Sequence, residues 1–201
     1  MHLAAIVLAA GRSQRFGVDN KLLARLADGP VIVHSIVALT GSSFRDIIVV
    51  TGEDHVGIAD ALRKYPVRLV RCDPGRCGIG YSIAAGVNAL SDRTIGVAIL
   101  LADMPLIRTA TLNALADAFI AANASRIVYA ADLDGTQRNP VIWPRSSFTA
   151  LRNLTEDRGA KALIHDAVAV TVRDRLEFLD VDTRDALSTA WLELIYRETE
   201  V

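Results

Sequence analysis

A loop rich in small residues and cations follows the first apolar run of the chain. Residues 8–21 read LAAGRSQRFGVDNK and come directly after residues 3–8, whose apolar pattern predicts a buried strand. Small side chains let a ligand approach the backbone, and free N–H groups with cations suit a polyphosphate. The alternative is a surface loop with scattered charges. The candidate binding residues are Leu8, Ala9, Ala10, Gly11, Arg12, Ser13, Arg15 and Lys21.

A carboxylate follows another apolar run. Asp103 comes after residues 95–101, and Pro105 ends the predicted strand just beyond it. The side chain is therefore expected at the carboxyl end of the strand, where ligands bind in open parallel sheets. Mg²⁺ prefers oxygen ligands and is bound by one or two carboxylates plus substrate phosphates. We expect Asp103 to bind Mg²⁺ or Mn²⁺, because it lies too early to cap the helix predicted from Thr109.

A second carboxylate is offered by residues 178–187, which read FLDVDTRDAL. Asp182 is the candidate metal ligand, and Asp180 lies two residues earlier on the same face of an extended segment. Thr183 is well placed as the N-cap of the next predicted helix, so the alternative interpretation of both residues is a polar strand end beside that cap.

A glycine-rich segment precedes another predicted helix. Gly75, Gly78 and Gly80 follow the strand that ends near Arg71, and Ser82 opens the helix. A helix N-terminus with a serine hydroxyl can donate hydrogen bonds to a base or a ribose. We therefore expect Gly80 and Ser82 to contact a nucleotide, although helix capping alone also explains Ser82.

The elements that must position these residues alternate between strand and helix patterns. This alternation predicts an α/β fold, a Rossmann-like three-layer sandwich with a mostly parallel sheet. Residues 132–144 predict a turn and an extended piece over one edge of the sheet. The loops after Leu8, Arg71 and Leu101 should converge on one site. Strands are predicted at 3–8, 46–51, 67–71, 95–101, 126–131 and 168–173, and helices at 30–40, 54–64, 81–90, 109–122, 145–152, 157–165 and 184–197.

Composition limits the classes of partner. The chain has 201 residues, and this length predicts one domain over residues 1–201. A formal net charge of −1 disfavours nucleic acid, because no excess of cations is present to neutralise its phosphates. No apolar stretch reaches the length of a membrane span, and a strand begins too early for a signal peptide. These features predict a cytoplasmic protein.

Several of these motifs together resemble the molybdenum-cofactor nucleotidyltransferases. Residues 8–21 are similar to the family signature L-A-(A/G)-G-x-S-x-R-(M/F)-G-x-x-K, with one extra residue before the lysine. Residues 99–107 resemble the (G/A)-D-x-P element, and residues 178–187 resemble D-(I/V)-D-T-P-E-D-L with Arg184 in place of proline. The segment from Gly75 to Gly86 resembles G-(M/L)-x-x-S-L-x-x-G.

The resemblance continues in two later segments. Residues 137–144 are similar to G-x-P-(G/R)-H-P-V, but Asn139 stands where histidine is common and cannot titrate. Residues 156–163 resemble (D/E)-x-G-A-(R/K)-x-L and include Lys161. This similarity implies that Asn139 and Lys161 contact the acceptor substrate. An exposed amphipathic lysine is the alternative for Lys161.

The resemblance implies a fold, a reaction and residue roles. The fold is of the nucleotide-diphospho-sugar transferase type. The reaction is transfer of CMP from CTP to the phosphate of molybdopterin or molybdenum cofactor, with release of pyrophosphate. The implied roles are Arg15 and Lys21 on the triphosphate, Asp103 and Asp182 on Mg²⁺, and Leu8, Ala9, Ala10 and Ser82 at the base.

The sequence leaves alternatives for the substrate and for catalysis. Guanylyl-transferring relatives carry L-A-G-G, whereas the methyl group of Ala10 narrows the expected base pocket and favours CTP over GTP. Other readings are a GTP-using guanylyltransferase, a nucleotidyltransferase with a different phosphorylated acceptor, and a non-catalytic carrier. If the chain is a molybdenum-cofactor enzyme, and equally if it is a carrier, a molybdenum hydroxylase is the expected recipient of the cofactor.

Overall fold

Seven strands form one mostly parallel sheet. The computed structural model describes residues 1–11, 16, 20–73, 78–157 and 159–199. Every neighbouring pair of strands is parallel except the two pairs that involve β8, which runs antiparallel to β6 and β7. The order across the sheet is β5 (Arg68–Arg71), β4 (Asp46–Thr51), β1 (His2–Ala9), β6 (Thr94–Leu101), β8 (Gln137–Pro144), β7 (Ile127–Ala131) and β9 (Ala167–Thr171).

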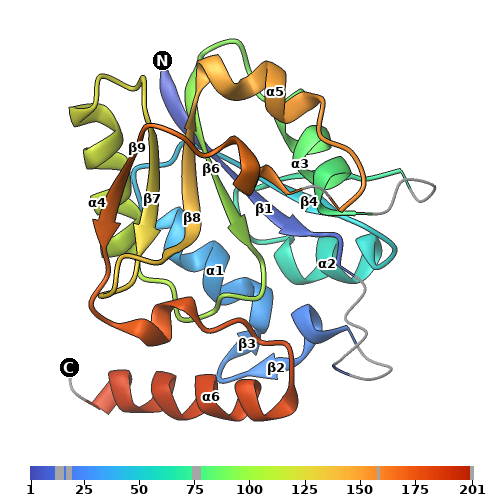
Figure 1. Ribbon diagram of the computed structural model, residues 1–201. Coiled ribbons are helices and arrows are strands. Elements are labelled where there is room, and N and C mark those ends of the chain that lie inside the picture. Colours follow the sequence, from blue (N-terminus) through green and yellow to red (C-terminus); the bar gives the residue numbers. More distant parts are fainter. Residues whose placement is uncertain (12–15, 17–19, 74–77, 158, 200–201) are drawn as a thin grey trace.

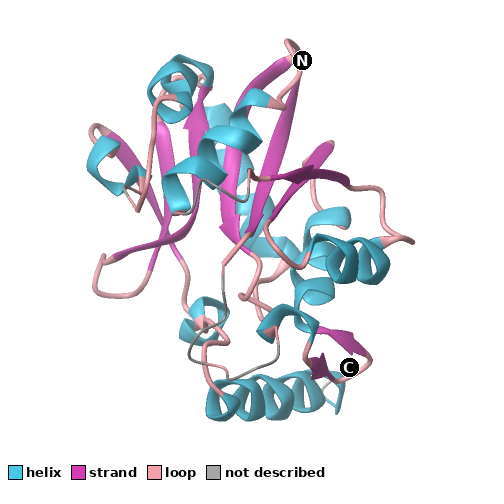
Figure 2. Cartoon of the chain, turned by 90° about the vertical axis from the view of Figure 1, so that its right-hand side faces the viewer, coloured by secondary structure: helices cyan, strands magenta, loops and turns pink. Residues whose placement is uncertain are grey.

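Helices cover both faces of this sheet (Figures 1 and 2). Helices α1 (Val31–Thr40), α2 (His55–Leu62) and α4 (Thr109–Ala121) pack on one face, in a core shared with alternate residues of β1. Helices α3 (Ile79–Asn88) and α5 (Phe148–Arg152) pack on the other. Because both faces are covered, the central strands are apolar at nearly every position rather than at alternate ones. The predicted three-layer α/β sandwich is confirmed.

A layer made of several short elements and one long helix lies beyond the carboxyl ends of the parallel strands. It includes η1 (Lys21–Leu23), β2 (Arg25–Leu26), β3 (Gly29–Pro30), η4 (Arg175–Phe178) and α6 (Arg184–Thr199). Figure 1 shows α6 below the sheet, beside β2 and β3. A small core that contains Leu26, Leu106 and Val181 joins these elements to the loop after β6. This layer brings residues from both ends of the chain to one edge of the sheet.

Two predicted elements are wrong. Residues 137–144 form β8 inside the sheet between β6 and β7, rather than an extended piece over its edge. A turn at residues 132–136 connects β7 to β8 as an antiparallel hairpin, and Val141, Ile142 and Trp143 are buried between the two helical layers. The helix predicted at 157–165 is only the 3₁₀ turn η3 (Ala160–Leu163), with Gly159 and Ile164 extended on either side.

The remaining elements agree closely with the predictions. Pro30 precedes the first turn of α1, and Pro144 precedes η2 (Arg145–Ser147), which leads into α5. The hydroxyl of Thr183 accepts a hydrogen bond from the N–H of Ala186 and caps α6, as its position predicts. Among the residues that the structure describes, no helix combines the length and apolarity needed to cross a bilayer.

Candidate active site

Three charged side chains from distant parts of the sequence meet at the carboxyl edge of the sheet. The ammonium group of Lys21 contacts a carboxylate oxygen of Asp103 and one of Asp182. Asp103 follows β6, Lys21 begins η1, and Asp182 lies just before α6. The Lys21 and Asp103 side chains are 12% and 13% exposed, and that of Asp182 is 45% exposed. The structure therefore brings together both predicted metal ligands and one predicted phosphate-binding cation.

Backbone contacts fix the position of Asp103. Its carbonyl oxygen accepts a hydrogen bond of 2.9 Å from the N–H of Val181, which joins the two segments that carry Asp103 and Asp182. Ser35 of α1 is fully buried, and its hydroxyl lies 3.3 Å from the carbonyl oxygen of Ala102 and 3.1 Å from that of Met104. A single hydroxyl thus contacts the backbone on both sides of Asp103 and limits its movement.

The charges at this cluster shift two pKa values. Burial of the Lys21 ammonium favours its neutral form, but the attraction and hydrogen bonds of Asp103 and Asp182 outweigh burial, so the pKa of Lys21 lies above its usual value of 10.5. Desolvation of the Asp180 carboxyl group, together with repulsion from Asp103 and Asp182, raises the pKa of Asp180 to about 6. The site therefore carries an excess of negative charge that Lys21 balances only in part.

The carboxylates fit a divalent cation that also binds substrate. The second carboxylate oxygen of Asp103, Oδ1, is buried and has no hydrogen-bond partner among the described residues. A buried carboxylate oxygen without a partner is costly unless a ligand satisfies it. The described residues contain no group of three or more His, Cys, Asp or Glu side chains arranged around a metal position. A protein usually contributes one or two carboxylates to a Mg²⁺ site, and phosphate oxygens of the substrate complete the coordination.

A pocket of about 290 Å³ lies beside the carboxylates. Its walls are mostly apolar and include Leu8, Ile83 and Trp143. Leu8 is one of the predicted base-contacting residues. The polar side chains around it are Gln137, Arg138, Asn139, Lys161 and Asp180. The pocket thus places both predicted acceptor-binding residues, Asn139 and Lys161, together with Leu8.

An ion pair holds one cation at this pocket. The guanidinium group of Arg138 donates to Oδ2 of Asp132 through Nε, at 3.0 Å, and through Nη2, at 2.8 Å. Asp132 is buried, and Arg175 also approaches it at 3.6 Å. A charge-assisted pair with a buried carboxylate restricts the arginine to few conformations. Arg138 therefore presents a fixed positive charge to whatever occupies the pocket.

The small residues after β1 lie close to the loop after β4. A Cβ atom at Gly52 would lie 2.9 Å from the carbonyl oxygen of Ala10, so only glycine allows this approach. Ala9 ends β1, and Gly11 is exposed. The predicted phosphate-binding residues Arg12, Ser13 and Arg15 lie outside the described residues.

The glycine-rich segment differs from the prediction at Ser82. Helix α3 begins at Ile79, so Ser82 is inside the helix, is buried, and its hydroxyl donates to the carbonyl oxygen of Gly78. The N–H of Gly80 donates to the carbonyl oxygen of Glu156 at 2.8 Å. Gly78 has a φ of +120°, and a Cβ atom there would lie 2.3 Å from the backbone of Glu156. Both groups expected to bind nucleotide therefore already have protein partners.

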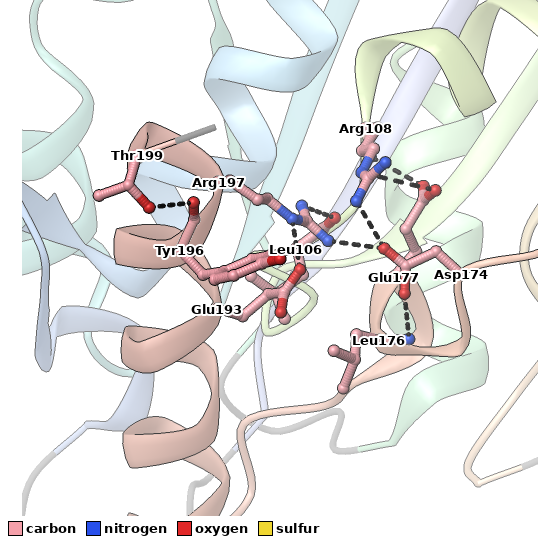
Figure 3. A network of polar contacts seen from close by, with 9 residues as sticks. All are labelled: Leu106, Arg108, Asp174, Leu176, Glu177, Glu193, Tyr196, Arg197 and Thr199. Atoms are coloured by element: carbon pink, nitrogen blue, oxygen red, sulfur yellow. Dashed lines mark hydrogen bonds and ion pairs between the residues drawn. The ribbon is translucent and has the colours of Figure 1, made fainter. Parts of the chain in front are cut away.

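An ion network ties together the segments that carry Asp103 and Asp182 (Figure 3). Arg197 of α6 donates to the carbonyl oxygen of Leu106 at 3.0 Å, to Asp174 at 3.0 Å and to Glu193 at 2.8 Å. Arg108 donates to Asp174 at 2.6 Å through its side chain. Its backbone N–H donates at 3.0 Å to Glu177, which is buried. The loop after β6, η4 and α6 thus share one set of charges.

Three residues that shape the site were not identified from the sequence, namely Ser35, Arg138 and Arg197. Ser35 carries no local signal, because a serine in an apolar helix is unremarkable until its partners are known. Arg138 had a weak signal in the sequence DLDGTQR, since Asp-Gly between extended segments is typical of a hairpin that would pair Asp132 with Arg138. Arg197 and its partners are far apart in the sequence and had none.

Known proteins are similar to this chain in sequence. The sequence profile of the MobA-like NTP transferase domain matches residues 5–172. A probable molybdenum cofactor guanylyltransferase from Chloroflexus aggregans is 34% identical over 118 residues, which cover 58% of this chain and 53% of that protein. The chain spans about half or less of the length of the first curated relatives it matches.

Solved structures share the fold over nearly the whole chain. Rv0371c from Mycobacterium tuberculosis H37Rv matches with a TM-score of 0.81 and 26% identity, over 96% of this chain and 98% of that one. A second structure of that protein is a complex with manganese, with a TM-score of 0.77 and 24% identity over 96% and 99% of the two chains. A nucleotidyl transferase from Methanothermobacter matches with a TM-score of 0.83 and 20% identity, over 98% and 99%.

The profile match covers most of the chain and includes β6, Lys21 and Asp103, and it ends before Asp182. The matched region therefore holds most of the sheet and one of the two carboxylates. This chain therefore belongs to the MobA-like NTP transferase domain family, a family of nucleotidyltransferase enzymes.

Proposed function

We propose that the chain transfers a cytidylyl group from CTP to the phosphate of a molybdopterin-type acceptor. The observation that carries this proposal is the meeting of Lys21, Asp103 and Asp182 beside a largely apolar pocket. A cation and two carboxylates at the carboxyl edge of a parallel sheet suit a triphosphate and its metal ion. The pocket beside them suits the body of the acceptor.

In this reaction the protein aligns the two substrates and stabilises the charge that develops on the phosphates. An oxygen of the acceptor phosphate attacks the α-phosphorus of CTP, the bond from that phosphorus to the β-phosphate oxygen breaks, and pyrophosphate leaves. Asp103 and Asp182 would hold Mg²⁺ or Mn²⁺, which neutralises charge on the triphosphate and on the pyrophosphate. Lys21, with Arg15 from the same loop, would stabilise the charge that moves onto the leaving group.

The acceptor would lie in the pocket between β1, β6 and β8. Asn139 can both donate and accept hydrogen bonds there, and Arg138 and Lys161 provide positive charge for an anionic acceptor. The apolar side chains in its walls would displace part of the water around the attacking phosphate, which strengthens these electrostatic contacts. Such an acceptor would reach a molybdenum hydroxylase after transfer, in the cytoplasm.

The choice of base rests on Ala10. Its methyl group would narrow the space for the base and favour a pyrimidine, and one methyl group supplies ~1–3 kcal/mol of discrimination, or roughly 10–200-fold. GTP is the alternative, since a relative at 34% identity is named a probable guanylyltransferase. Turnover with CTP exceeding turnover with GTP supports the proposal, and Ala10→Gly should reduce the preference. A wild-type preference for GTP contradicts it.

Pyrophosphate release with CTP, Mg²⁺ and molybdopterin cofactor tests the reaction itself. Asp103→Ala should reduce release by well over the ~10²–10³-fold commonly lost with one strong transition-state contact. Nucleotide binding to this variant without Mg²⁺ should barely change, or should tighten slightly, because the carboxylate that repels the phosphates is gone. Tight cofactor binding without release above background would instead indicate a carrier. Release with a sugar phosphate but not with molybdopterin would indicate a different acceptor.

A further inference from the structure

The position between Asp103 and Asp182 is held by the ammonium group of Lys21. This is also the position in which the proposed function needs a divalent cation. Two carboxylates so close together repel each other, and Lys21 supplies only one positive charge against their two negative charges. An ammonium group and a divalent cation in contact with the same pair of carboxylates would repel each other strongly.

Only the side chain of Lys21 needs to move for another cation to enter. Its backbone is fixed by the neighbouring residues. The side-chain oxygen of Asn20 accepts from the N–H of Leu22 at 2.9 Å, and the amide of Asn20 donates to Asp54 at 2.7 Å. Leu22 is buried in the main core. Lysine has a long flexible stem, so rotation of that stem carries the ammonium away from the carboxylates without disturbing η1.

We propose that Lys21 is an internal counter-cation that a divalent metal ion displaces, and that displacement releases its ammonium group toward the triphosphate. This inference rests on the proposed function and deepens it. In the metal-free protein, Lys21 stabilises the carboxylate pair. Once a divalent cation takes over that role, the released lysine can contact the nucleotide phosphates, so metal and nucleotide binding support each other.

Displacement has a measurable cost in metal affinity. A metal ion that enters the wild-type site must break the contacts of Lys21 with Asp103 and Asp182, so removing the lysine charge should tighten metal binding in the absence of nucleotide. We expect Lys21→Met to bind Mn²⁺ on the order of tenfold more tightly than the wild-type chain, as measured by the electron paramagnetic resonance signal of free Mn²⁺. Lys64→Met is the matched control, because Lys64 is exposed beyond α2 and should leave the affinity unchanged.

The double variant Lys21→Met with Asp103→Asn separates the inference from the proposed function. Tighter binding in Lys21→Met that is lost in the double variant supports both. Equal affinity in the wild type and Lys21→Met, still lost with Asp103→Asn, overturns the exchange but leaves the metal site. Mn²⁺ binding that is insensitive to Asp103→Asn in either background overturns the metal site, and with it the inference.

Nuclear magnetic resonance of the lysine side chains tests the movement directly. The chain has three lysines, Lys21, Lys64 and Lys161, so the resonances of their ε-methylene groups can be assigned by substitution. Adding Mg²⁺ without nucleotide should shift the Lys21 signal and leave the Lys64 signal unchanged. A Lys21 signal that stays unchanged at Mg²⁺ concentrations that fill the Asp103 site would show that the lysine stays in place, and the inference would be wrong.

Discussion

At the scale of single residues, the site depends on groups that act on the carboxylate pair. Ser35 is the clearest case, since its buried hydroxyl lies between the carbonyl groups on either side of Asp103. Asp180 is a second case, because it adds negative charge beside Asp103 and Asp182 and lines the adjoining pocket. Each leads to a prediction that separates its effect from that of Asp103 itself.

Ser35→Ala should weaken the site more than it weakens the fold. Loss of one buried hydrogen bond costs ~1 kcal/mol, which corresponds to a fall of roughly 2–4 °C in melting temperature for a chain of this length. We also expect weaker Mn²⁺ binding, because Asp103 becomes less well positioned. Ser42→Ala, which removes a hydroxyl contact to Leu39 at the end of the same helix, is the control. Equal effects of both substitutions on Mn²⁺ affinity would contradict this role.

The raised pKa of Asp180 predicts how stability changes with pH in the metal-free protein. The folded chain holds this proton up to about pH 6, whereas the ordinary value is 3.8, so the folded state binds more protons between these values and stability falls as pH rises through them. Asp180→Asn removes that penalty. We expect a higher melting temperature than the wild type at pH 7.5 in a chelator, and little difference near pH 4.

The size of this effect is limited by solvent. Although desolvation raises the pKa of Asp180, much of the surface of this residue is exposed to solvent, so we expect a gain of ~1 kcal/mol at most, or roughly 2–4 °C. Asp117→Asn, on the exposed side of α4, gives the baseline for removing one negative charge. A gain for Asp180→Asn that is the same at pH 4 and pH 7.5 would rule out titration of this carboxyl group as its cause.

At the scale of elements, the loop after β6, η4 and α6 behave as one unit. Arg197 reaches from the last turns of α6 to the carbonyl oxygen of Leu106 and to Asp174, at the start of η4 (Figure 3). The segments that carry Asp103 and Asp182 are therefore joined twice, once by the contact of Val181 with Asp103 and once by this network. Loosening the network should change the spacing of the two carboxylates.

Arg197→Gln tests this coupling between elements. Hydrogen bonds to charged groups contribute ~1.5–3 kcal/mol each, and a partly exposed network contributes less, so we expect a loss of ~1–3 kcal/mol in the free energy of unfolding. Mn²⁺ affinity should also fall, although Arg197 does not contact the carboxylate pair. Arg126→Gln breaks an exposed ion pair with Asp166 and should affect neither quantity. Normal Mn²⁺ affinity in a destabilised Arg197→Gln chain would limit the network to a structural role.

At the scale of the whole molecule, the layer beyond the sheet is joined to it by a small core and by ion pairs. The fluorescence of the two tryptophans can show whether these two parts unfold together. Trp143 of β8 is 2% exposed in the sheet, and Trp191 of α6 is 37% exposed. A single domain over residues 1–201 predicts that both parts unfold in one cooperative transition.

Single-tryptophan variants measure the two parts separately. We expect the fluorescence midpoint in urea of Trp191→Phe, which reports on the sheet, to coincide with the circular dichroism midpoint of the same variant. In Trp143→Phe, the remaining tryptophan reports on α6, and its fluorescence midpoint should also coincide with the circular dichroism midpoint. Both midpoints should lie at a lower urea concentration than in the wild type, because the substitution alters a buried side chain. A fluorescence transition of Trp191 that precedes the loss of the sheet would show that α6 unfolds independently.

The sequence by itself determined the features that depend on neighbouring residues. Apolar runs such as 95–101 determine strands, and a polar residue directly after one, such as Asp103, lies at a strand end. Parallel pairing follows from the alternation of strands with helices, which places such ends at one edge of the sheet. The three-layer architecture, the cap at Thr183 and the position of Asp103 after β6 could therefore be predicted.

Only the tertiary structure decided which distant residues meet. Residues 137–144 have the composition of any extended segment, and their place between β6 and β7 depends on which side chains fill the core between both helical layers. Lys21 and Asp182 are 161 positions apart, and their contact depends on how α6 packs beyond the strand ends. Packing of this kind is a property of all the layers together, because the free energy of burial depends on surfaces from many segments at once, and no local pattern encodes it.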